Sequence, residues 1–153
     1  MTESAPKITR PVVTVYTDGA CKGNPGRGGW GAWLASEGHE KELFGGEVLT
    51  TNNRMELTAA IEALRSLKTP NQVDLYTDST YLMKGITEWM PKWLAKNWRG
   101  SSGPVLNKEL WQALLAETEK HIIYWHWVKG HSSNRYNQRV DALVQKARNL
   151  KRY

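Results

Sequence analysis

The chain has 153 residues, of which 40% are hydrophobic, enough for one ordinary core and with no stretch that indicates a second domain. Lysine and arginine outnumber the acidic residues 21 to 15, and the formal net charge of +6 suits a polyanion or an acidic membrane surface without choosing between them. The single cysteine, Cys21, excludes an internal disulfide and a multi-cysteine zinc site, and it favours a reducing compartment.

Residues 1–11 include Glu3, Lys7 and Arg10 and contain no continuous apolar segment, so they match neither a signal peptide nor a membrane span. We therefore expect a cytoplasmic protein with no membrane contact. The expected plan of the chain is a short flexible tail at 1–11, a single domain at 12–148 and a short basic tail at 149–153.

The first third of the chain predicts three strands. Residues 12–17 are a β-branched and aromatic run that stops at Asp18, and the glycines and proline within residues 19–29 are typical of a glycine-rich turn. Residues 30–35 and 42–48 have the pattern of two further strands joined by a turn. We therefore expect an antiparallel meander.

From Asn53 the hydrophobic period changes to three and four residues, which predicts an amphipathic helix that ends near Pro70. Its apolar stripe consists of Leu57, Ala60, Ile61, Leu64 and Leu67. Residues 73–77 then form a short strand that ends at Asp78. A helix between two such strands implies a parallel pair with a right-handed crossover.

Residues 79–98 have a helical pattern interrupted by Gly85 and Pro91, and residues 100–104 are expected to form a loop. The remaining elements are, in order, a helix at 110–117, a strand at 121–128, a loop at 129–136 and a final helix whose apolar stripe is Val140, Leu143, Val144 and Ala147. Strands that alternate with helices in this way predict an α/β fold.

Asp18 and Asp78 follow two runs that share the ending Tyr-Thr-Asp. If the two strands are parallel neighbours, the carboxylates lie side by side at one sheet edge, where open α/β folds place ligands. Each aspartate alone is equally well explained as a turn or helix-cap residue, because aspartate accepts backbone hydrogen bonds at such positions. The occurrence of both favours a functional site.

Glu56 and Asp141 are further candidates, and each has a structural alternative. Glu56 lies three residues after Asn53 and can complete a capping box, whereas its place beside the apolar stripe predicts a carboxylate at the border of the core. Asp141 lies at the expected head of the last helix, where the helix dipole favours an acid. Gathered acids repel one another unless a cation lies between them, and oxygen-rich clusters suit Mg²⁺ or Mn²⁺.

Four segments carry motifs that are specific when they occur together in this order. The segments are Tyr16-Thr-Asp-Gly-Ala-Cys-Lys-Gly-Asn-Pro-Gly26, Thr51-Asn-Asn-Arg-Met-Glu-Leu57, Tyr76-Thr-Asp-Ser79, and Trp127-Val-Lys-Gly-His131 with Asn137 and Asp141. Through them the chain resembles bacterial ribonuclease H type 1 from about Val12 to Ala147. The resemblance implies a ribonuclease H-like α/β fold, a five-stranded mixed sheet flanked by helices on both faces, which agrees with the expected element order.

The resemblance also implies a reaction and its cofactor. The family cuts the RNA strand of RNA:DNA hybrids with two Mg²⁺ ions, and Mn²⁺ is an alternative; the residues that match its metal ligands are Asp18, Glu56, Asp78 and Asp141. His131 matches the histidine of a mobile loop that assists proton transfer or product release. We expect a monomer that needs no obligate protein partner.

Substrate contacts are implied as well. Cys21, Asn24, Asn52 and Asn53 match positions that contact the hybrid, largely in its minor groove, where a 2′-hydroxyl distinguishes RNA from DNA. The other implied contacts are Thr51 with a phosphate, Thr80 where bacterial relatives often carry glutamine, and Asn137 in the last motif.

Residues 89–99 resemble the basic protrusion that grips the DNA strand in this family. Lys92, Lys96 and Arg99 can neutralise phosphates, and an exposed tryptophan offers a flat face to a sugar or base. At helical spacing Trp89 and Trp93 can both pack inward, so we predict surface contact only for Trp89 and the three cations.

The chain departs from the family pattern at Ser133, where glycine is frequent, and at Gln138, where glutamate is frequent. These changes affect the expected loop motion and the negative charge near the metals.

Two alternatives share these features. Integrases, resolvases and some exonucleases have the same fold with clustered acids, but the match at Asn52, Asn53 and His131 argues against them. A non-catalytic nucleic-acid-binding module is permitted by the basic charge, but it gains nothing from four acids that face phosphate.

Overall fold

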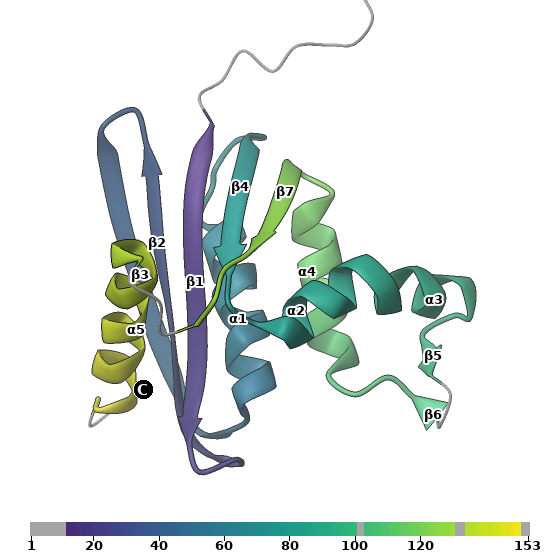
Figure 1. Ribbon diagram of the computed structural model, residues 1–153. Coiled ribbons are helices and arrows are strands. Elements are labelled where there is room, and N and C mark those ends of the chain that lie inside the picture. The colour runs from purple at the N-terminus through teal and green to yellow at the C-terminus, as the bar shows by residue number, and fades with distance from the viewer. Residues whose placement is uncertain (1–11, 101–102, 131–133, 151–153) are drawn as a thin grey trace, which may run out of the picture.

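A five-stranded mixed sheet forms the centre of the protein, with the strand order β3-β2-β1-β4-β7 (Figure 1). The computed structural model describes residues 12–100, 103–130 and 134–150, so the tail expected at 1–11 lies outside the described residues. The strands are β1 (Val13–Lys22), β2 (Gly26–Ser36), β3 (His39–Thr50), β4 (Gln72–Thr77) and β7 (Ile122–Trp127). β1, β4 and β7 are parallel, whereas β2 pairs antiparallel with β1 and β3, which confirms both the meander and the parallel pair.

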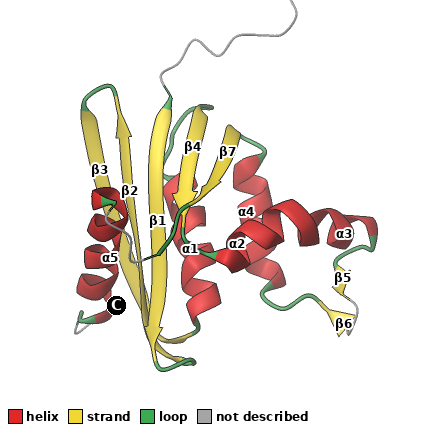
Figure 2. Ribbon diagram, in the orientation of Figure 1, coloured by secondary structure: helices red, strands yellow, loops and turns green. Residues whose placement is uncertain are grey.

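Helices cover both faces of the sheet, as expected (Figure 2). One face carries α1 (Asn52–Arg65) and α4 (Lys108–Thr118), and the other carries α5 (Arg135–Arg148) against β1, β2 and β3. A helical arm projects away from the sheet and consists of α2 (Thr80–Lys84), the π-helical turn η1 (Gly85–Trp89) and α3 (Met90–Ala95). A small hairpin of β5 (Arg99–Gly100) and β6 (Gly103–Pro104) follows the arm. Among the described residues, no helix has both the length and the apolar character needed to cross a membrane.

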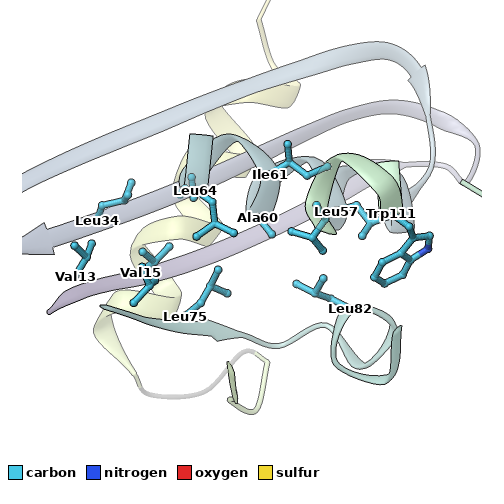
Figure 3. Close-up of a cluster of buried hydrophobic side chains, with 14 of the residues drawn as sticks. Val13, Val15, Leu34, Leu57, Ala60, Ile61, Leu64, Leu75, Leu82 and Trp111 are labelled. Atoms are coloured by element: carbon cyan, nitrogen blue, oxygen red, sulfur yellow. The ribbon is translucent and has the colours of Figure 1, made fainter. Parts of the chain in front are cut away.

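The larger hydrophobic core lies between the sheet and α1 (Figure 3). Val15 and Leu75 of the parallel strands meet Leu57 and Leu64 of α1, and Trp111 of α4 is fully buried in the same cluster. The helical stripe predicted from the sequence therefore faces the sheet. A second cluster lies under α5 and consists of Tyr16, Trp33, Val140 and Leu143.

β1 is longer than the sequence pattern predicts, and this changes the place of Asp18. The strand continues past Asp18 to Lys22, because residues on both sides of a short turn pair with each other. Two of the glycines that indicated a turn instead permit close packing: a Cβ on Gly19 would clash with the Met55 backbone of α1, and one on Gly29 would lie 2.8 Å from the Ala147 Cβ of α5. Asp18 therefore lies within a strand rather than at its end.

The interruption expected at Gly85 and Pro91 takes the form of one π-helical turn, so the chain stays helical throughout the arm. Gly85 is buried against the ring of Trp111, where any side chain would clash. Pro91 lies in the first turn of α3, a position where its missing N–H costs little. The arm is therefore a continuous projection, anchored on the core at Gly85.

Candidate active site

Asp18 and Asp78 lie where the parallel pairing of β1 and β4 ends. The register pairs Tyr16 with Tyr76 and Thr17 with Thr77, and Asp78 is the residue that follows β4. Because parallel strands in register advance together, the next residue of each occupies a neighbouring position. The topology thus brings the two aspartates together, as the sequence predicts.

Asp18 has a strongly perturbed carboxyl group. Burial, followed by the negative charges of Asp78 and Asp141 and then of Glu56, raises the pKa of Asp18 to about 8. The backbone N–H of Gly19 donates a hydrogen bond of 2.9 Å to Asp18 Oδ1 and opposes this shift without cancelling it. Since the three other predicted acids all act on one carboxyl group, the four gather at one place.

Glu56 reaches the cluster from α1, which begins earlier than predicted. Thr51 is the N-cap of α1, and its Oγ1 accepts a hydrogen bond of 3.2 Å from the N–H of Arg54. The helix is therefore capped without Glu56, whose carboxylate instead accepts a hydrogen bond from Ser79. Burial raises the pKa of Glu56 to about 7 despite that bond, and Asp78 adds to the increase.

Asp141 reaches the cluster from the opposite face of the sheet, on α5. The sequence places it at the head of this helix, but α5 begins at Arg135, so Asp141 lies in the second turn. The reason is that Asn134 is the N-cap: its Oδ1 accepts hydrogen bonds from the N–H groups of Tyr136 and Asn137 at 2.9 and 3.1 Å. Because the dipole effect falls off within the first turn, it does not account for an acid at this position.

The four carboxylates form a negative cluster rather than a closed metal shell. Within residues 12–100, 103–130 and 134–150, no three histidine, cysteine or acidic side chains are arranged to hold a metal ion. The donor set fits a hard divalent cation, since Mg²⁺ and Mn²⁺ prefer carboxylate oxygens.

Three predicted substrate contacts form one hydrogen-bonded group. Asn52 Oδ1 accepts a bond of 2.7 Å from the N–H of Cys21, and the N–H of Asn52 donates to Asn24 Oδ1 at 3.1 Å. Burial raises the pKa of the Cys21 thiol. The end of β1, the turn after it and the start of α1 are thereby fixed together, with Thr51 and Asn53 on either side of Asn52.

Two other predicted contacts lie on different helices. Asn137 is 4% exposed in the first turn of α5, and its side chain is thus almost wholly enclosed. Thr80 is exposed at the first position of α2, two residues after Asp78. Of the two, Thr80 is the one that presents its side chain to solvent.

The predicted DNA contacts lie on the helical arm and on the segment that leads from it into the β5 hairpin. Lys92, Lys96 and Arg99 are exposed, as expected for groups that meet phosphates. Trp89 is half-buried, with its ring centroid 5.6 Å from that of Tyr81 and 6.1 Å from that of Trp93. The prediction of surface contact by Trp89 is thus restricted to the part of the ring that these neighbours leave open.

His131 lies outside the described residues, as does Ser133. The segment before His131 contacts Asp78 in a way that the sequence pattern does not indicate. Trp127 Nε1 donates a hydrogen bond of 3.2 Å to the backbone oxygen of Asp78, and a Cβ on Gly130 would lie 2.8 Å from Asp78 Oδ2. Trp127 and Gly130 both belong to the last sequence motif, but their contacts with Asp78 depend on the pairing of β7 with β4.

The strand order and the acids beside the parallel strands together define an α/β protein of the ribonuclease H-like class. The family profile described as RNase H matches residues 10–149. A ribonuclease H of Hahella chejuensis is 63% identical over 133 residues, which cover 86% of this chain and 90% of that protein. One of Chromohalobacter salexigens is 57% identical over 148 residues, 96% of this chain and 90% of the relative. The chain belongs to the RNase H family.

Solved structures agree with this assignment. A crystal structure of a type 1 RNase H with the type 2 active-site motif superposes with a TM-score of 0.83 at 34% identity, and the match covers 93% of this chain and 74% of that chain. The ribonuclease H-like fold expected from the motifs is therefore confirmed.

Proposed function

We propose that this chain is an endonuclease that hydrolyses the RNA strand of RNA:DNA hybrids with Mg²⁺ held by Asp18, Glu56, Asp78 and Asp141. The observation that carries the proposal is the convergence of these acids on the Asp18 carboxyl group in a protein of net charge +6. Lysine and arginine attract a polyanion, whereas a bare acidic cluster repels phosphate. The two features are compatible when divalent cations occupy the cluster.

Divalent ions at this cluster would activate a water and neutralise charge on the leaving oxygen; two ions with the substrate, or Mn²⁺ in place of Mg²⁺, suit the same donors. The chain's own part is to hold the donor oxygens in place. Gly19 donates to Asp18, Ser79 donates to Glu56, and Gly130 leaves room beside Asp78. The carboxylate oxygens come from separate elements that pack against one another, so their positions do not depend on a metal-binding loop.

The RNA strand is proposed to run along the group formed by Cys21, Asn24 and Asn52. Amide side chains both donate and accept hydrogen bonds, which suits a minor groove that displays 2′-hydroxyls. The other proposed contacts are Thr51, Asn53, Thr80 and Asn137, and for the DNA strand Trp89, Lys92, Lys96 and Arg99. The exposure of the arm cations supports their assignment to phosphates.

The test is a cleavage assay on a labelled hybrid with Mg²⁺ and with excess chelator. We expect cleavage of the RNA strand with metal, little action on double-stranded RNA or DNA, and loss of cleavage in Asp78→Asn. Asp74→Asn is a matched control, because Asp74 lies on β4, the strand that Asp78 directly follows, and is paired with His126 at 2.9 Å. Full activity of Asp78→Asn, or in chelator, would sink the proposal.

His131 is proposed to assist proton transfer or product release. We also propose that the enzyme acts as a monomer in the cytoplasm, since one chain supplies every proposed ligand and the lone Cys21 favours a reducing compartment. Light scattering on the active protein tests the oligomeric state, and a dimeric mass would contradict it.

A further inference from the structure

Val48 and Leu49 are neighbouring apolar side chains that both point into solvent at the end of β3. Val48 is 68% exposed and Leu49 is 72% exposed, whereas the next residue, Thr50, is buried. In a regular strand, residues two apart lie on the same face. The different burial of Val48 and Thr50 therefore shows that the alternation breaks at this point.

A β-bulge causes the break. Gly26 of β2 pairs with Thr50 and Gly28 pairs with Glu47, so the step from 47 to 50 on β3 matches the shorter step from 26 to 28 on β2. A bulge leaves a residue unpaired and redirects side chains, and bulges are frequent beside active sites. Because the two partners on β2 are glycines, they have no side chains with which to cover the apolar pair.

The bulge leads directly into the proposed binding surface. Thr50 precedes Thr51, the N-cap of α1, and Asn52, which is bonded to Cys21 and Asn24. β3 ends at the same end of the sheet as β1 (Figure 1). The apolar pair thus lies at the rim of the surface on which the hybrid is proposed to bind, and continues it.

We propose that Val48 and Leu49 extend the hybrid-binding surface by an apolar contact with the sugar faces of the nucleic-acid backbone, an inference that rests on the proposed function. Sugars present C–H surface between the phosphates, and covering Val48 and Leu49 removes apolar area from water. Unlike phosphate neutralisation, this contact releases no counterions, so its contribution to affinity persists at high salt.

The experiment measures the Kd of a hybrid in excess chelator over a range of salt concentrations. The variant is Val48→Ser with Leu49→Ser, and the matched control is Val12→Ser with Ile122→Ser, a similar pair 41% and 48% exposed at the amino ends of the parallel strands. We expect the first variant to bind roughly five- to tenfold more weakly at every salt concentration with an unchanged salt slope. The control is expected to bind like the wild type.

A second variant tests the position of the contact. Leu49→Lys gains a phosphate contact if the side chain lies against the backbone, so the salt slope steepens by about 0.9, and Ile122→Lys does not change it. Equal Kd values for the two serine variants, or equal slopes for the two lysine variants, overturn this inference and leave the proposed function intact. A wild-type protein that neither binds the hybrid in this experiment nor cleaves it with Mg²⁺ overturns the proposed function itself.

Discussion

The acidic centre and the helical arm use charge in opposite ways. The centre holds Asp18 and Glu56 partly buried, with pKa values raised to about 8 and about 7. The arm and the hairpin that follows it carry Lys92, Lys96 and Arg99 in solvent, where their charges remain hydrated. In the centre, the carboxyl groups proposed to bind metal therefore lower the stability of the metal-free fold. In the arm, the cations proposed to bind DNA have little effect on stability. Substitutions in the two regions are expected to separate these quantities.

The largest expected effect comes from Asp18→Asn. The substitution removes a proposed metal ligand, so hybrid cleavage falls by more than about 100-fold. In chelator at neutral pH the free energy of unfolding of the variant rises above that of the wild type, because burial, together with the charges of Asp78 and Asp141, forces the wild-type carboxyl group to take up a proton on folding. Cleavage rates and urea unfolding measure the two effects, and a metal-free variant less stable than the wild type would contradict the opposition between function and stability.

The proximity of Asp18 and Asp78 could be predicted because it needs only a parallel pair of strands, and chain order supplies that. The extent of β1 could not be predicted, since glycine marks turns and also close packing. Gly19 is a close-packing glycine and not a turn glycine, and only the packing of α1 against β1 shows which of the two roles it has. The fold class is thus accessible from the pattern, whereas the exact place of Asp18 in its strand is not.

The contacts made by the four acids were harder to predict from the sequence than the acids themselves. Ser79 bonds Glu56, and Gly130 lies against Asp78, yet each pair is far apart in the sequence. Such contacts depend on registers between elements that no local pattern encodes. The start of α5 was also misplaced, because Asn134 has the cap chemistry but lies in a segment expected to be a loop.

Gly130→Ala is expected to have the next largest effect in the centre. The added Cβ would lie 2.8 Å from Asp78 Oδ2 and displaces a proposed ligand, so metal affinity falls roughly 10- to 100-fold. Calorimetric titration with Mg²⁺ measures this. In the Asp78→Asn background the same alanine adds little, since the displaced ligand is already impaired. An equal loss in both backgrounds would show that Gly130 acts elsewhere.

Replacement of Lys92, Lys96 and Arg99 by alanine tests the arm. We expect weaker hybrid binding and a salt slope reduced by about 0.9 for each phosphate that is no longer neutralised, with the free energy of unfolding nearly unchanged. A matched control replaces Lys41, Lys68 and Lys120, which are also exposed but lie away from the arm. If both triple variants change the slope alike, net charge and not the arm governs binding.

The last expected effect is a pH dependence of the free energy of unfolding that is confined to the centre. The pKa of Asp18 is raised from 3.8 to about 8 on folding, so between these values the folded state holds a proton that the unfolded state has lost. The free energy of unfolding of the metal-free protein therefore carries a contribution that is complete at the acidic end of this window and declines toward pH 8. Glu56 acts in the same direction up to about pH 7.

Urea unfolding in chelator at a series of pH values measures this decline. Asp18→Asn is expected to make the decline shallower and to leave only the part below about pH 7 that Glu56 contributes, whereas the triple variant of the arm is expected to preserve the full decline. Saturating Mg²⁺ binds only the folded cluster with its carboxylates ionised, so it raises stability most at the alkaline end and offsets the slope. A decline that is equally steep in Asp18→Asn would mean that folding does not raise the pKa of Asp18, and the contrast between the centre and the arm would lose its electrostatic basis.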